Sequence, residues 1–152
     1  YKYSIYVDGN IEILADLTQL VNNIRQSAVA FYAHSKRNCV FDEYRACKIL
    51  GKGDLPILKA QVEQYKRECF PEAYGMVEAN VIAREHNNET CISLMEDWWK
   101  EFCKWESRDQ ISLPYVAWKK GISMDDLATL GPDVHNELRL KIYKHNQRGA
   151  AQ

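Results

Sequence analysis

Short runs of β-branched and aromatic residues alternate along this chain with longer segments whose apolar residues recur at helical spacing. The runs at 3–7, 28–33 and 75–86 are typical of strands, and a short one at 11–14 is a further candidate. Because helical segments separate the runs, the pattern predicts the α/β class. In such sheets ligands gather at the carboxyl ends of strands, so the polar residues that follow each run are the first candidates for a site.

The helical spacing also predicts how the rest of the chain is organised. Helices are expected at 17–26, 41–50, 55–69 and 90–105, another after Asp109, and a short one opening at Ser123. The segment from 131 to 152 is polar and basic and predicts a loose C-terminal tail. We therefore expect one folded domain over residues 1–130, followed by the tail.

Composition narrows the possible functions and locations. The chain has 20 Lys and Arg against 21 Asp and Glu, which argues against a protein whose main task is to coat nucleic acid. The five Cys residues are widely spaced, with no Cys-x-x-Cys, so free thiols in a reducing, cytoplasmic compartment are expected. No apolar run is long enough for a transmembrane segment. Because Tyr1 leads almost directly into a strand, we expect sequence upstream of it to be missing.

The turn Asp8-Gly9-Asn10 closes the first predicted strand and carries the first candidate chemistry. Asp8 supplies a carboxylate and Asn10 an amide oxygen, the ligand types that Mg²⁺ and Mn²⁺ prefer beside substrate phosphates. The same three residues also favour a simple hairpin turn between 3–7 and 11–14. The sequence leaves both interpretations open.

Two polar clusters follow the later strands. His34 and Arg37 come after the run at 28–33, where they indicate either a ligand site or a surface loop. Arg84 and His86 share one face of the third predicted strand, and the shape of Arg suits phosphate or carboxylate. A histidine satisfied inside the structure is the alternative for His86.

The junction of the last two long helices offers a third cluster. Arg108, Asp109 and Gln110 combine a cation, a carboxylate and an amide, the mix of donors and acceptors that a sugar requires, although they also suit a solvated turn between helices. Trp99 lies off the apolar stripe that contains Trp98, so it is a candidate to stack on a sugar or to pack on a neighbouring helix.

Taken in order, these residues resemble the TOD/MUCI glycosyltransferase-like domain family, found in plant Golgi proteins and in bacterial enzymes of surface polysaccharides. The resemblance covers about residues 1–120 and favours a bacterial, polysaccharide-type member. The motifs in chain order are Tyr6-Val7-Asp8-Gly9-Asn10; His34-x-x-Arg37 with Cys39 and Glu43; Gln61 and Gln64 before Tyr65; Arg84-x-His86-Asn87; Met95-Glu96-x-Trp98-Trp99; and Ser107-Arg108-Asp109-Gln110-Ile111-Ser112-Leu113-Pro114-Tyr115.

The resemblance implies a GT-A-like mixed sheet flanked by helices, without the N-terminal half that binds the nucleotide. It also implies a nucleotide-sugar donor, a saccharide acceptor and a divalent metal, Mn²⁺ or Mg²⁺. Asp8 and Asn10 fall on the D-x-D metal motif of such enzymes, with Asn10 a departure from the second Asp. Asp109 and Gln110 resemble an Asp-Gln pair found near the sugar and acceptor in related families.

The predicted function is therefore transfer of a sugar from a nucleotide sugar to a saccharide acceptor in surface polysaccharide synthesis. Asp109, with Arg108 and Gln110, is the predicted catalytic group, and Arg84 or Arg37 would stabilise the leaving diphosphate. His34, His86 and Trp99 complete the predicted substrate site. A metal-dependent nuclease of the NYN/PIN type and a non-catalytic glycan- or protein-binding module are the alternatives.

Overall fold

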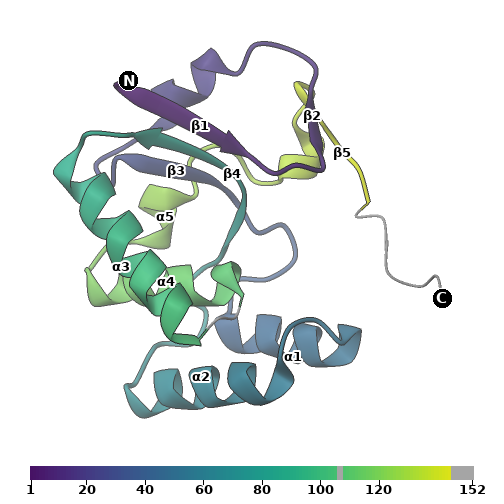
Figure 1. The fold of residues 1–152 in the computed structure, drawn as a ribbon, viewed down its shortest axis with the longest axis vertical. Helices are drawn as coiled ribbons and strands as arrows, with labels where there is room; N and C mark the ends of the chain where they lie inside the picture. Colours follow the sequence, from purple (N-terminus) through teal and green to yellow (C-terminus); the bar gives the residue numbers. More distant parts are fainter. Residues whose placement is uncertain (106–107, 145–152) are drawn as a thin grey trace.

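A computed structural model describes residues 1–105 and 108–144 and contains a three-stranded antiparallel sheet (Figure 1). The longest strand, β4 (Val77–Glu85), lies in the centre, between β1 (Tyr3–Val7) and β3 (Val29–Ala33). A second, two-stranded antiparallel sheet pairs β2 (Ile11–Ile13) with β5 (Leu140–Ile142). Helices and strands together confirm the α/β class.

The register of the main sheet decides which side chains reach the helices. Residues directly opposite each other on paired strands point to the same face. Tyr6 pairs with Ile82, which lies in the core beneath the helices, and Ser4 pairs with Arg84. Tyr6 and Arg84 therefore share the face that the helices cover, while alternate residues such as Ala83 belong to a second apolar cluster on the other face.

Five α-helices complete the described part of the fold. They are α1 (Val40–Leu50), α2 (Leu55–Arg67), α3 (Glu89–Trp105), α4 (Asp109–Lys119) and α5 (Met124–Leu127). All five confirm helices that the spacing predicts. Helix α4 contacts α3, α1 and β4, so it lies between the sheet and the α1–α2 pair (Figure 1). None of the helices in the described ranges is long and apolar enough to cross a membrane.

Local sequence signals account for the boundaries of the α1–α2 hairpin. Gly51 ends α1 in the left-handed conformation that glycine adopts without steric cost. The carboxylate of Asp54 then accepts a hydrogen bond from Ile57 N at 3.1 Å and caps α2. Pro56 lies in the first turn of that helix, where its missing N–H leaves no partner unsatisfied.

The helix predicted at 17–26 is wrong. The segment forms only a 3-10 helix, Thr18–Asn23, flanked by turns. Leu20 alone is buried within it, and its β-branched and Asn residues are weak helix formers.

The interpretation of Asp8-Gly9-Asn10 as a hairpin turn between 3–7 and 11–14 is also wrong, because β1 pairs with β4 and β2 pairs with β5. The three residues do form a turn, closed by a hydrogen bond from Ile11 N to Asp8 O at 3.0 Å.

The predicted C-terminal tail is folded over much of its length. Two residues of this segment are buried: Val134 in a short 3-10 helix (Val134–Asn136) and Leu140 in β5. Both belong to the second apolar cluster, on the face of the sheet that the helices do not cover. Two apolar residues therefore anchor a segment whose average composition is polar. Residues 145–152, the rest of the predicted tail, lie outside the described residues.

Gly75, which precedes β4, permits a close approach that any side chain would block. Its φ is +107°, and a Cβ there would lie 2.6 Å from Met124 Cβ. We expect Gly75→Ala to lower the free energy of unfolding by about 2 kcal/mol, from backbone strain together with overpacking. Urea denaturation would measure this. Gly9→Ala is the control, because no heavy atom lies within 4 Å of its added Cβ, and an equal loss in both variants would contradict the explanation.

Candidate functional site

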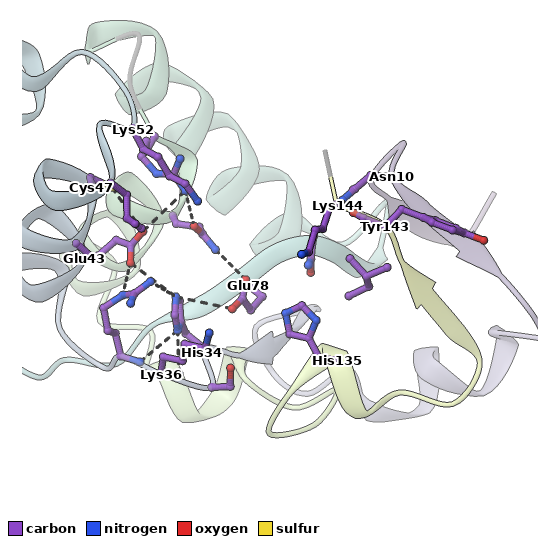
Figure 2. A pocket seen from close by; sticks show the side chains of 18 residues that line it. Asn10, His34, Lys36, Glu43, Cys47, Lys52, Glu78, His135, Tyr143 and Lys144 are labelled. Carbon is purple, nitrogen blue, oxygen red and sulfur yellow. Dashed lines mark hydrogen bonds and ion pairs between the residues drawn. The ribbon is translucent and has the colours of Figure 1, made fainter. Parts of the chain in front are cut away.

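A pocket of about 530 Å³ opens between α1, the start of α4, β4 and the β2–β5 sheet (Figure 2). We call it the charged pocket. Its polar and charged lining residues are Asn10, His34, Ser35, Lys36, Arg37, Glu43, Lys52, Glu78, Asn80, Arg108, Gln110, His135, Tyr143 and Lys144. Five of the predicted site residues, Asn10, His34, Arg37, Arg108 and Gln110, therefore lie around one cavity.

Glu43 is the central carboxylate of this pocket, with a side chain only 4% exposed. Arg37 Nε donates a hydrogen bond to Glu43 Oε2, and Arg108 Nη2 lies 3.8 Å from Glu43 Oε1. The thiol of Cys47 lies 3.7 Å from Oε1, and burial raises its pKa, so it stays protonated and donates to the carboxylate. One buried carboxylate therefore holds two guanidinium groups at the pocket wall.

His34 is fixed in one orientation by the backbone that follows it. Its Nδ1 accepts hydrogen bonds from the backbone N–H groups of Lys36 and Arg37, each at 3.2 Å. Nδ1 therefore acts as an acceptor, while Arg37 Nη2 lies 3.4 Å from the other ring nitrogen, Nε2. That nitrogen lies 3.7 Å from a carboxylate oxygen of Glu43 and 3.7 Å from one of Glu78.

Gln110 and Arg108 connect the start of α4 to the sheet. Gln110 Nε2 donates to Glu78 Oε2 at 3.1 Å, and Arg108 Nη2 donates to Gln110 Oε1 at 3.0 Å. Two buried polar atoms of lining residues, Arg108 Nε and Asn80 Oδ1, have no hydrogen-bond partner among the residues that the structure describes. A buried donor and a buried acceptor without partners are costly, and both belong to residues that line the charged pocket.

The electrostatic balance of the charged pocket differs from that of the chain. Five cationic side chains line it, against the two carboxylates of Glu43 and Glu78, an excess of three positive charges when the histidines are left out of the count. The whole chain has a formal charge of −1. A local excess of this size in a cavity attracts anions. The cations are Lys36, Arg37, Lys52, Arg108 and Lys144.

A second pocket, of about 520 Å³, lies against α3 and is lined by Arg84, Met95, Trp98, Trp99, Phe102 and Asp109. We call it the aromatic pocket. Trp98 is held in place because its Nε1 donates to Ser112 Oγ at 3.0 Å. Trp99 is 66% exposed and stacks on Phe102, with ring centroids 5.8 Å apart and planes 21° apart. Trp98 thus follows the packing interpretation, whereas Trp99 presents its ring to solvent.

Tyr6 connects Asp8 to the aromatic pocket. Its hydroxyl donates to Asp8 Oδ1 at 2.7 Å, and this hydrogen bond is the main reason that the pKa of the phenol is raised. Burial adds to the increase, as do the nearby charges of Asp8 and Asp109, while Arg84 opposes it. Asp8, Arg84 and Asp109 thus all influence the electrostatics of one phenol. His86 lies apart, 3.4 Å from Ser4 Oγ, and lines neither pocket.

The predicted metal ligands do not form a ligand set by themselves. Asp8 already accepts from Tyr6, while Asn10 directs its amide nitrogen to Tyr143 O at 2.8 Å. Within residues 1–105 and 108–144, no three His, Cys, Asp or Glu side chains are grouped to hold a metal ion. A cation at Asp8 would need most of its ligands from the substrate, so metal binding stays a prediction.

The sequence interpretation missed several residues of the charged pocket as site residues, chiefly Glu43 and Glu78. A signal for Glu43 exists, because it shares a helix face with Val40 and Cys47, and an acid on an apolar stripe needs a buried partner. Glu78 carries no such signal within its strand. His135 and Lys144 were assigned to the tail and so were not considered.

An α/β domain with a cationic pocket and an adjoining aromatic pocket has the features of a protein that binds anionic and sugar-like ligands. Comparison with known proteins defines the class further. The sequence matches the TOD1/MUCI70, glycosyltransferase-like domain over residues 1–145, and the chain belongs to that family.

One relative is a probable hexosyltransferase, MUCI70, from Arabidopsis thaliana. It is 32% identical over 130 residues, which cover 76% of this chain but only 22% of the relative. The chain thus spans about a fifth of that protein's length. No solved structure matches the chain significantly. The family match includes residues 131–144, consistent with their folded state.

Proposed function

We propose that this domain acts in the transfer of a hexose from a nucleotide-sugar donor to a saccharide acceptor. The charged pocket carries the proposal, because a domain of the glycosyltransferase-like family concentrates five cations around a cavity large enough for a nucleotide sugar. The similarity to a probable hexosyltransferase supports a hexose. Surface polysaccharide synthesis and a cytoplasmic location remain predictions, the latter from the free thiols.

The charged pocket would bind the diphosphate of the donor. Glu43 fixes Arg37 and Arg108, so their guanidinium groups are preorganised before a ligand arrives. Negative charge grows on the diphosphate as the glycosidic bond breaks, and fixed cations stabilise that charge more than mobile ones do. Arg84, the alternative for this role, lines the aromatic pocket instead.

Asp109 would receive the proton of the acceptor hydroxyl. Its carboxylate lines the aromatic pocket, while the next residue, Gln110, lines the charged pocket. The acceptor oxygen forms a bond to the anomeric carbon, the bond from that carbon to the diphosphate oxygen breaks, and the proton passes to Asp109. Mn²⁺ or Mg²⁺ at Asp8 remains a proposal, and no step here depends on it.

Binding of nucleotide sugars to an Arg108→Gln variant tests the proposed function. We expect the affinity to fall about 10- to 100-fold, because a charge-assisted hydrogen bond to phosphate is lost. Isothermal titration with uridine and guanosine diphosphate hexoses, with and without Mn²⁺, would measure this. The control is Arg45→Gln, which removes an exposed arginine on α1 whose side chain is 70% accessible.

Two results would refute the proposal. One is a protein that includes the sequence expected upstream of Tyr1 and binds none of these nucleotide sugars, with or without Mn²⁺. The other is an Arg108→Gln variant that is folded by circular dichroism yet binds as tightly as Arg45→Gln. The nuclease alternative requires several acidic residues around shared metals, and no observation among the described residues favours it.

A further inference from the structure

We propose that the aromatic pocket is a separate subsite that binds a sugar ring of the acceptor by stacking on Trp99. The assignment rests on the proposed function, because the acceptor is the second substrate of that reaction. The two pockets share no lining residue. The sequence predicts one substrate site, but its residues are divided between two pockets of different chemistry.

The apolar side of the pocket is built to present a flat surface. Trp98 is held by its hydrogen bond to Ser112, and the ring of Phe102 stacks on that of Trp99. Trp99 itself leaves two thirds of its surface in contact with water. A large exposed aromatic ring beside Met95 and Phe102 forms an apolar patch, and such patches mark binding surfaces. The C–H face of a pyranose ring has matching shape and polarity.

Polar groups at the edge of the pocket select a hydroxylated ligand over a purely apolar one. Arg84 lines the pocket and can offer guanidinium N–H donors, and its buried Nε has no hydrogen-bond partner among the described residues. The carboxylate of Asp109 supplies a hydrogen-bond acceptor, which complements the donor of Arg84. Sites that pair their polar groups with substrate hydroxyls discriminate strongly against ligands that lack them.

The charge balance separates this pocket from the other. Arg84 and Asp109 are the only ionisable side chains among its described lining residues, and their charges cancel. The charged pocket has an excess of three positive charges by the same count. A neutral sugar fits the aromatic pocket, and a diphosphate fits the charged one.

The start of α4 places the two pockets next to each other. Asp109 and Gln110 are consecutive residues, and each lines a different pocket. Tyr6 extends the connection, since its hydroxyl binds Asp8 and its electrostatic neighbours include both Arg84 and Asp109. A saccharide stacked on Trp99 would thus place a hydroxyl beside the carboxylate that is proposed to take its proton.

The test is saccharide binding by the Trp99→Ala variant. An array of defined oligosaccharides of hexoses, hexosamines and uronic acids identifies the best probe for the wild-type protein, and titration calorimetry gives its affinity. We expect Trp99→Ala to bind that probe about ten-fold more weakly, the loss of one aromatic stacking contact. Tyr1→Ala is the matched control, because Tyr1 is a fully exposed aromatic residue outside both pockets.

The same proteins are titrated with a uridine diphosphate hexose, so that the two proposals fail separately. Weaker saccharide binding by Trp99→Ala with unchanged nucleotide-sugar binding supports the subsite. Saccharide binding that survives in Trp99→Ala, or a wild-type protein that binds nothing on the array, overturns it. A wild-type protein that binds the saccharide probe but no nucleotide sugar refutes the function proposed for the charged pocket. The saccharide result would then still support the subsite.

Discussion

Replacing Glu43 with alanine is expected to lower the free energy of unfolding by about 3–5 kcal/mol. The carboxylate is 4% exposed and compensates two guanidinium groups, those of Arg37 and Arg108. Removing the buried carboxylate leaves two partly buried guanidinium groups, each 27% exposed, without their counter-charge, which is costly. For a domain of this size the loss corresponds to a fall in Tm of about 6–20 °C. Thermal and urea unfolding would measure it.

The matched control for this variant is the preceding residue. Asp42 also lies in the first turn of α1, and its ion pair with Arg45 is exposed on both sides. Asp42→Ala should therefore cost no more than about 1 kcal/mol. Glu43→Gln, which keeps the shape and removes the charge, should fall between the two. If Glu43→Ala proved as stable as Asp42→Ala, the buried network would not hold the pocket together.

Replacing Asp109 with asparagine is expected to reduce kcat for hexose transfer by about 10²- to 10⁴-fold, the usual contribution of a positioned base. The substitution keeps the shape of the side chain and its ability to accept from Gln110 N, a contact of 2.9 Å. The KM for the nucleotide sugar should stay the same, because Asp109 does not line the charged pocket. Transfer from a labelled nucleotide sugar to the saccharide probe gives both constants.

Asp125→Asn controls for the loss of a carboxylate from a first helical turn. Asp125 lies in the first turn of α5, is exposed and lines neither pocket. Its variant should retain full activity. A kcat for Asp109→Asn within two-fold of that control would remove Asp109 from the mechanism. If only the KM for the saccharide acceptor rose, Asp109 would be assigned to acceptor binding rather than to proton transfer.

The regular elements were readable from the sequence where local signals agree. Asp54 and Gly51 mark helix ends by chemistry that acts within a few residues, and the structure has both caps. The wrong predictions concern residues whose burial depends on contacts with distant parts of the sequence. Leu140 is buried against residues far away in the sequence, such as Ala83 in β4, and no window of neighbouring residues shows that burial. Average polarity therefore misassigned the end of the chain.

The candidate site shows the same limit more sharply. Residues such as His34 and Gln110 stood out because polar clusters follow predicted elements, and both lie in the charged pocket. What the sequence could not show is the division into two pockets, which depends on how α4 sits against the sheet. The role of Glu43 is likewise tertiary, because its partners come from a loop and from the start of a distant helix.

The pairing of β2 with β5 brings residues from distant parts of the described chain together at the charged pocket. Ile11 pairs with Ile142, so this strand contact joins the two ends of the described chain. During synthesis the three-stranded sheet and α4 can assemble while Tyr143 and Lys144 are still absent. Closing so long a loop is entropically expensive and slow. The charged pocket therefore has all of its described lining residues in place only once β5 has paired with β2.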